Sequence, residues 1–235
     1  MPIGILMDTG AVVLGGFAGS ILGNRLREDI KQKMNWIFGI CALGMGISSV
    51  ILMQNMPPVV FSVITGTLLG LLLKFGSAIE TGTEKLLAAM ANKTEQGQKD
   101  LMLTAVVLFC ASGTGIYGAL DAGMTGNHNI LIAKAVLDFF TAAIFACQLG
   151  KVTSMIGIPQ FAVLMTLFLL AKVILPLTND AMIRDFKACG GFLLLATGFR
   201  MMQLRSFPVA DMIPAMVLVM PVSYLWTQWV LPFIS

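Results

Sequence analysis

Two residues of opposite charge, Lys134 and Asp138, lie one helical turn apart inside an apolar stretch that runs from Ile130 to Leu149. The stretch has the length of a membrane-crossing helix, roughly 20 residues. At a rise of about 1.5 Å per residue, Asp138 lies roughly 12 Å below the start of that helix, near the middle of a hydrocarbon core about 30 Å thick. A charge at this depth costs at least about 2.5 kcal/mol on insertion scales. Both side chains are therefore expected to face a partner, the interior of a helix bundle or water.

Further residues, most of them polar, share a helical face with this pair. The stripe consists of Lys134, Asp138, Thr141, Phe145 and Gln148, which are four, three, four and three residues apart. At about 100° per residue, these spacings place them on one narrow face. Asp138 could bind an ion or a proton, and Lys134 could tune it or contact an anion. Thr141 and Gln148 could act as neutral ligands further inward. We therefore predict a channel or secondary transporter for a small ion or polar solute.

The same pair also has a purely structural interpretation. Lys134 and Asp138 can neutralise each other, although lysine on the N-terminal side is the weaker orientation of such a pair. The pair would then only specify helix packing, in a structural or regulatory membrane protein that transports nothing. The two interpretations differ in whether the stripe is hydrated.

The composition excludes an ordinary soluble domain, because 57% of the 235 residues are hydrophobic and only 11% are charged. Apolar segments recur along the chain and predict an all-α, polytopic transmembrane bundle, since a membrane barrel would show alternating segments of about ten residues. We expect about eight spans in a single domain, residues 1–235. They cover roughly residues 3–23, 34–54, 59–73, 101–120, 130–149, 158–175, 188–204 and 209–232.

Basic residues indicate the orientation of these spans. They gather in the loop from Arg25 to Lys33 and near Lys74, as in cytoplasmic loops. We predict a multi-pass protein of the cytoplasmic membrane with both termini outside. Residues 80–99 form the longest polar segment and are expected to be an amphipathic cytoplasmic connector between two helix groups. The last span contains Pro214 and Pro221, which predict a kink and also permit a re-entrant segment.

Small residues repeat at intervals of four in the first and third spans. Gly15, Gly19 and Gly23 form one ridge, and Gly66 and Gly70 form another. Such ridges allow close helix contact, either within the chain or between copies in a homo-oligomer. Their similarity suggests a weak internal repeat.

Other polar residues could contribute to the path. The glycine-rich run from Ser112 to Gly118 permits an unwound turn, which is tolerated at membrane depth only beside protein or a water-filled cavity. The further candidates are Thr114, Asp121, Thr125, Asn127, Asn129 and Lys172. Of these, Asn127 or Asn129 could cap the fifth helix, and Lys172 could reach the outer surface or meet Asp138. Asp8 lies only a turn or two from the outer end of the first span, where it could reach interfacial water, and a functional role is the alternative.

Several kinds of site are not expected. The four cysteines lie in apolar segments without CxxC spacing, and His128 is the only histidine. We therefore predict no metal site, no cofactor and no disulfide, and no enzymatic activity, because no acid and base constellation is present. The net charge of +3 is small, and the basic residues lie beside helix ends without interleaved aromatics. Nucleic acid is thus not an expected partner, whereas the lipid bilayer is.

Two motifs carry a family resemblance. The runs AVVLGGFAGSILGNRL and GALDAGMTGNHNILIAKAVLDFFTAAIFA resemble the YqgA/YdfK family of bacterial integral membrane proteins, grouped under a domain of unknown function. The resemblance covers essentially the whole chain. It implies a bacterial cytoplasmic membrane location and supplies no catalytic residues. The second motif includes Lys134 and Asp138, the pair already singled out by its cost in the membrane.

Overall fold

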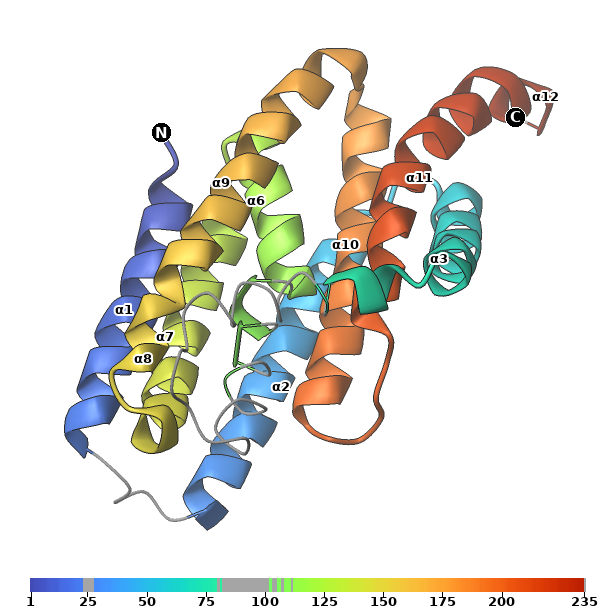
Figure 1. Cartoon of the computed structure of the whole chain (residues 1–235). Coiled ribbons are helices and arrows are strands. Elements are labelled where there is room, and N and C mark those ends of the chain that lie inside the picture. Colours follow the sequence, from blue (N-terminus) through green and yellow to red (C-terminus); the bar gives the residue numbers. More distant parts are fainter. Residues whose placement is uncertain are drawn as a thin grey trace.

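The structure, a computed structural model, describes residues 1–22, 28–79, 81, 102, 105–106, 108–110 and 112–234. These residues form helices and no strand, which confirms the prediction of an all-α bundle (Figure 1). The predicted connector at residues 80–99 lies outside the described part except for Thr81, and so does Gly23.

The described part of the bundle consists mainly of long helices. The main helices are α1 (Ile3–Leu22), α2 (Glu28–Val50), α3 (Met56–Leu72), α6 (Gly113–Thr125), α7 (Asn129–Leu149), α8 (Val152–Met155), α9 (Gly157–Ile174), α10 (Asp180–Met201) and α11 (Ile213–Leu225). Short elements are η2 (Leu175–Leu177), η3 (Val209–Met212), the π-helix η4 (Trp226–Val230) and α12 (Leu231–Ile234). Within the described residues, four segments are long and apolar enough to cross a membrane: Ile3–Leu22, Asn129–Leu149, Val152–Leu177 and Val209–Phe233. The number of about eight spans therefore stays a prediction.

The start of α10 differs from the sequence expectation. The predicted spans 158–175 and 188–204 leave residues 176–187 as a connection between them, but α10 already begins at Asp180. The side chain of Asn179 caps the helix by accepting a hydrogen bond from the backbone N–H of Met182, at 2.9 Å. A cap of this kind satisfies a helix-start amide and lets a polar sequence begin a helix. The charged residues of this segment consequently lie on helical faces, where they can meet other helices.

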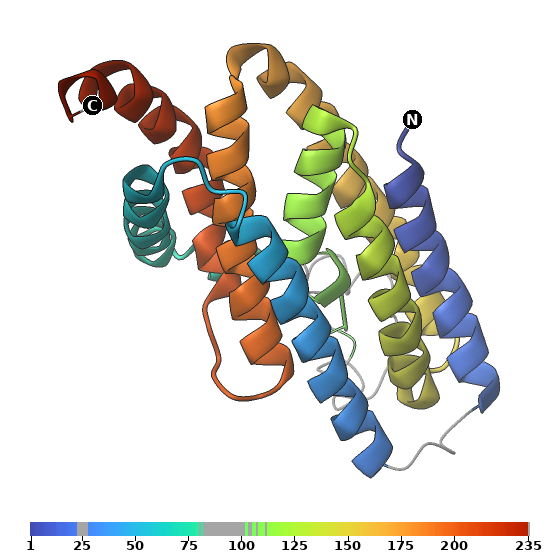
Figure 2. The same cartoon turned by 180° about the vertical axis from the view of Figure 1, so that it is seen from behind.

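The helices form two groups. α1, α6, α7, α8 and α9 pack mainly with one another, and α2, α3, α10 and α11 form the second group. The groups meet where α6 contacts α10 and where α2, which runs between α10 and α7 in Figure 2, contacts α7. Each group combines helices from both sides of residues 80–99, so the groups in space are not halves of the sequence.

The predicted glycine ridges make close contacts inside the chain. A Cβ added at Gly15 would lie 2.2 Å from the carbonyl oxygen of Phe139, and one added at Gly19 would lie 2.0 Å from that of Ala143. These contacts bring the backbones of α1 and α7 together in parallel. Gly66 and Gly70 bring α3 equally close to the start of α11 and to η3, but in antiparallel orientation. The described glycines of both ridges, Gly15, Gly19, Gly66 and Gly70, are thus covered within the chain, and the two pairings differ in direction.

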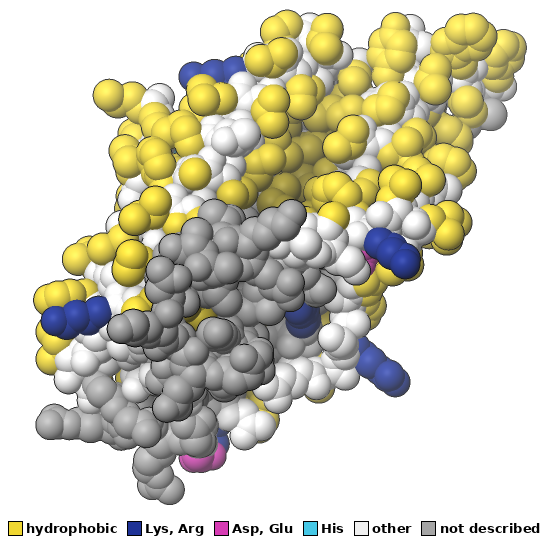
Figure 3. All heavy atoms as spheres, in the orientation of Figure 1, with side chains coloured by type: hydrophobic (Ala, Val, Ile, Leu, Met, Phe, Trp, Pro, Cys, Tyr) yellow, Lys and Arg dark blue, Asp and Glu magenta, His cyan; other side chains and the backbone are white. Residues whose placement is uncertain are grey.

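Apolar side chains also cover much of the outer surface, over the upper parts of the helices in Figure 3. Leu14, Ile21, Val173 and Val217 are among the large apolar residues that remain mostly exposed. An exposed apolar area of this extent is unusual for a soluble monomer and marks an interaction surface such as a membrane. Along the last helical segment, Pro221 lies inside α11 and the π-helix η4 follows, so the predicted proline site coincides with irregular helix geometry.

We expect Gly19→Ala to destabilise the protein because its methyl group would overlap the α7 backbone; overpacking typically costs about 1–3 kcal/mol. Gly10→Ala is the matched control on the same helix, since nothing lies within 4 Å of a Cβ added there. Alanine also favours helix by about 1 kcal/mol over glycine. Thermal unfolding in detergent should show a lower Tm for Gly19→Ala and an unchanged or higher Tm for Gly10→Ala. Equal Tm values would contradict the close contact of α1 and α7.

Candidate functional site

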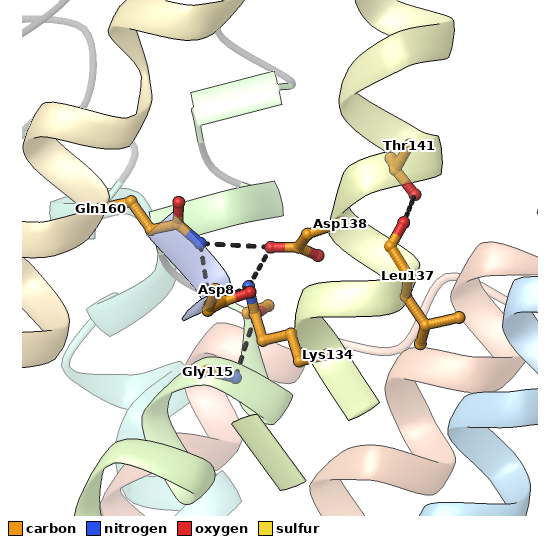
Figure 4. Close-up of polar contacts among 8 residues, drawn as sticks. Asp8, Gly115, Lys134, Leu137, Asp138, Thr141 and Gln160 are labelled. Atoms are coloured by element: carbon orange, nitrogen blue, oxygen red, sulfur yellow. Dashed lines mark hydrogen bonds and ion pairs between the residues drawn. The ribbon is translucent and has the colours of Figure 1, made fainter. Parts of the chain in front are cut away.

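A cluster of four polar side chains lies in the interior of the first helix group (Figure 4). Lys134 of α7 donates hydrogen bonds to Oδ2 of Asp8 on α1, at 3.0 Å, and to Oδ2 of Asp138 on α7. The Nε2 amide nitrogen of Gln160 on α9 donates to the same two oxygens, at 2.9 Å for Asp8 and 3.2 Å for Asp138. We call these four residues the acidic cluster. Two donors from two helices are thus shared by two carboxylates.

The parallel packing of α1 and α7 positions the cluster. Gly4 lies against Leu131 near the start of both helices, and Gly19 lies against Ala143 further along. Asp8 therefore falls level with the first half of α7, where Lys134 and Asp138 lie. Gln160 lies in the first turn of α9, a helix that runs opposite to α1 and α7. The expectation that Asp8 reaches interfacial water is wrong, because this packing leaves it 0% exposed.

The acidic cluster is buried and carries unequal numbers of charges. Gln160 is 0% exposed like Asp8, while Lys134 is 2% and Asp138 8% exposed. With both aspartates ionised, two negative charges face one ammonium, so the cluster carries one net negative charge. Oδ1 of Asp8 and Oε1 of Gln160 are buried and accept no hydrogen bond from the described residues. Burying a charge without full compensation is costly, so this arrangement calls for one further positive charge.

The broken fourth span touches this cluster. Ser112 has extended backbone and is the residue that caps the start of α6. Its Oγ accepts a hydrogen bond from the backbone N–H of Gly115, at 3.1 Å. Residues 108–110, just before it, are helical, so the helical path is interrupted at Ser112. A Cβ added at Gly115 would lie 3.2 Å from Cε of Lys134. The predicted irregular turn thus includes Ser112 but not Gly113 to Gly118, which are helical, and Gly115 lets the start of α6 approach the lysine.

The remaining part of the predicted stripe does not extend the cluster. Thr141 is buried, and its hydroxyl donates to the carbonyl oxygen of Leu137 in its own helix at 2.8 Å. Gln148 is exposed near the end of α7. Lys172 does not reach Asp138, because it lies at the other end of α9 with its ammonium 4.9 Å from the centre of the Phe168 ring. Of the stripe, only Lys134 and Asp138 belong to the acidic cluster.

The other predicted contributors lie on α6 and in the turn after it. Asp121 accepts hydrogen bonds from Thr125, at 3.0 Å, and forms an ion pair with Lys187 of α10, also at 3.0 Å. This contact links the two helix groups. Asn127 shapes the turn before α7 by accepting from the backbone N–H of Asn129 at 3.0 Å, and Thr114 is buried on α6. None of these residues takes part in the hydrogen bonds of the acidic cluster.

A second buried carboxylate, Asp185 of α10, was not predicted as a site. Its two oxygens accept hydrogen bonds from the backbone N–H groups of Gln54 and Asn55, at 2.9 and 2.7 Å, and from the Asn55 amide, at 3.0 Å. The hydroxyl of Ser223 donates a fourth, at 2.6 Å. Both oxygens are occupied by donors, so Asp185 joins the turn before α3 to α10 and α11 and has a structural role.

Comparison with known proteins identifies the family. The family described as "Protein of unknown function (DUF554)" matches residues 3–224. The chain belongs to this family. A DUF554 relative from Escherichia coli (strain K12), "Uncharacterized protein YqgA", is 44% identical over 97% of this chain and 99% of its own length. "Uncharacterized membrane protein YdfK" from Bacillus subtilis (strain 168) is 23% identical over 92% of this chain and 93% of its own. No solved structure matches.

The family assignment agrees with the resemblance found in the sequence. Together with the apolar helices, the membrane relative identifies this DUF554 chain as a membrane protein in contact with the lipid bilayer. The family description names no activity. The chemistry of the site therefore has to be argued from the acidic cluster itself.

We expect Lys134→Met to destabilise the protein strongly, because two buried carboxylates would lose their ammonium partner. Removing one member of a buried pair costs about 3–5 kcal/mol in soluble proteins. Lys172→Met is the matched control, since that lysine is exposed. Thermal unfolding should give a much lower Tm for Lys134→Met, partial recovery in Lys134→Met/Asp138→Asn, and little change for Lys172→Met. A wild-type Tm for Lys134→Met would show that the lysine does not stabilise the carboxylates.

Proposed function

We propose that this protein is a secondary transporter or channel for a small cation, protons included, and that the acidic cluster is its binding site. The observation that carries the proposal is that two buried carboxylates, Asp8 and Asp138, share the single ammonium of Lys134 in the apolar interior; with both ionised, one negative charge is uncompensated. Ionisable residues inside membrane bundles commonly mark ion paths or proton relays. In this proposal the protein crosses the bacterial cytoplasmic membrane several times, with both termini outside.

Comparison with the other buried carboxylates supports a binding role. Asp185 is surrounded by hydrogen-bond donors on both oxygens. Asp121 is matched one to one with Lys187. The acidic cluster differs because two carboxylates share one lysine and one amide. A buried oxygen without a donor among the described residues occurs at Asp8 and also at Asp121, so the shared lysine is the distinguishing feature. A site built only for packing would gain stability if either aspartate were neutral, so the excess charge argues for an exchangeable ligand.

Irregular helices near the site also suit a transporter. Discontinuous helices in secondary transporters place helix ends and free backbone groups beside the bound ion. Here the start of α6, at the Ser112 interruption, lies against Lys134 through Gly115. The π-helix η4 lies in the second helix group, and π-segments often occur at functional sites. Both features provide places where a helix could change shape during transport.

A structural or regulatory role is the second candidate, and one contact favours it. Lys134 and Asp138 form a direct ion pair within one turn of α7, as the packing interpretation requires. In that case the cluster would fix the alignment of α1, α7 and α9 and bind nothing. Flux measurements separate the two candidates.

We expect Asp8→Asn and Asp138→Asn to abolish most cation flux in liposomes containing the purified protein. A hydrogen bond to a charged group is worth about 1.5–3 kcal/mol, so each variant should lose at least about tenfold in rate. Proton and alkali-cation gradients are applied separately and followed with a pH-sensitive dye and ion-selective dyes. Asp29→Asn is the matched control, because Asp29 is an exposed aspartate on α2.

The variants are compared only after thermal unfolding has shown that they are folded. Wild-type protein without flux under any of these gradients would reject transport and leave the packing role. Flux that survives in both folded site variants would place the path elsewhere in the molecule.

A further inference from the structure

The acidic cluster lies between two apolar layers. Along each of the three helical segments, apolar residues flank the polar ones on the same face. They lie three or four residues before and after, and each is 0% exposed. Such spacing places the flanking residues one helical turn to either side. The flanking residues are Ile5 and Val12 around Asp8, Leu131 and Ala142 around the pair on α7, and Ile156 and Leu164 around Gln160.

The directions of the helices assemble these residues into two layers. α1 and α7 are parallel, whereas α9 runs the opposite way, with Gly157 at its start lying against Val13 of α1. Ile5, Leu131 and Leu164 therefore meet on the side of the α1 N-terminus, where they pack with Ala119, Ala122 and Phe168. We call this the upper layer. Val12, Ala142 and Ile156 meet on the other side and pack with Ala105, Val106, Phe109 and Cys110, which we call the lower layer.

The oxygens left in the cluster suit a proton better than a metal cation. Lys134 and Gln160 occupy one oxygen of each aspartate, which leaves Oδ1 of Asp8 and of Asp138 and Oε1 of Gln160. Metal cations bound by oxygen ligands typically take about six or more of them, and the apolar layers contribute none. A proton needs a single carboxylate oxygen. One proton on either aspartate would bring the net charge of the cluster to zero.

We propose that Asp8 and Asp138 together hold one exchangeable proton, enclosed between the upper and lower layers. The proton moves from water to a carboxylate oxygen when the site is open to one side, and returns to water when the site opens to the other. This inference rests on the proposed function for its role in transport, and it names the proton as the ion that the site binds. With both layers closed, the structure corresponds to a nearly occluded state, in which Asp8 is 0% and Asp138 8% exposed.

Within the part of the chain that the structure describes, few other titratable groups face the cluster from the surrounding helices. Cys110 lies in the lower layer. On the upper side, His128 lies beside Gly4, one turn above Asp8. Its Nδ1 is buried and forms no hydrogen bond with the described residues. Lys172 and Asp121 are engaged with Phe168 and Lys187, and α2 approaches α7 through Phe38 and Phe140. Of the described titratable groups, His128 is therefore the one best placed to pass protons to the upper side.

Infrared titration of the purified protein tests the proton. We expect the carbonyl band of one buried carboxylic acid at low pH, lost as the pH rises and unaffected by Na⁺ or K⁺. Asp8→Asn and Asp138→Asn should each remove this band, because the aspartate that remains is balanced by Lys134 and needs no proton. Asp29→Asn should keep it. In Lys134→Met, where two carboxylates lack a counter-charge, the band should double.

Three results would overturn the inference: no such band at any pH, displacement of the proton by Na⁺ or K⁺, or a band that persists in both aspartate variants. These outcomes are independent of flux. A band that behaves as expected in a protein without flux would reject the transport role and retain the proton site. Flux that depends on Asp8 without any such band would retain transport and reject the proton.

The reactivity of Cys110 toward a charged thiol reagent tests whether the lower layer is closed. In a chain whose other three cysteines are replaced by serine, we expect Cys110 to resist a charged thiol reagent, because it is buried in the lower layer. Ile156→Ala should thin that layer and raise the labelling rate at least tenfold from one side of the membrane. Val136→Ala is the control on the exposed face of α7. Rapid labelling of Cys110 before any layer residue is changed would show that the site is open and that no lower layer closes it.

Discussion

The sharing of one ammonium by two carboxylates is the interaction on which the interior of this protein depends. Each aspartate alone would be balanced by Lys134, but both together leave a charge that the apolar surroundings cannot stabilise. The amide of Gln160 adds a second donor without adding charge. The cluster is therefore held together by good hydrogen bonds and is nevertheless one positive charge short. That combination separates it from a saturated structural carboxylate such as Asp185.

Close backbone packing makes this arrangement possible. Asp8 reaches Lys134 because Gly15 and Gly19 remove the side chains that would keep α1 and α7 apart. These glycines carry no charged side chain and are not members of the acidic cluster. In membranes, where helices gain little from hydrophobic burial, small residues and interhelical hydrogen bonds supply much of the association energy. Here both are concentrated in one helix pair, so the geometry of the site and the stability of the fold have a common origin.

The sequence predicted the part of the site that carries a local signal. Lys134 and Asp138 stand out because charges in the middle of an apolar segment are costly, and the break near Ser112 follows from the glycines after it. Asp8 was misplaced because its distance from the helix end suggested access to the interface. Its true surroundings depend on a helix more than a hundred residues away, which no local pattern reveals. Gln160 is neutral and gave no cost signal. Its position between Ile156 and Leu164 at helical spacing was the available clue.

The pairing of α1 with α7 also constrains how the chain can assemble. Asp8 and Lys134 are separated by 126 positions in the sequence, so α1 is synthesised long before its ionic partner exists. During that interval Asp8 is in an early intermediate with no lysine to neutralise it, and a protonated carboxyl is its least costly form in lipid. The first helix must therefore insert before the ion pair can form, and the ion pair then adds to its stability. A fragment that ends before α7 contains the aspartate but cannot form the bundle around it.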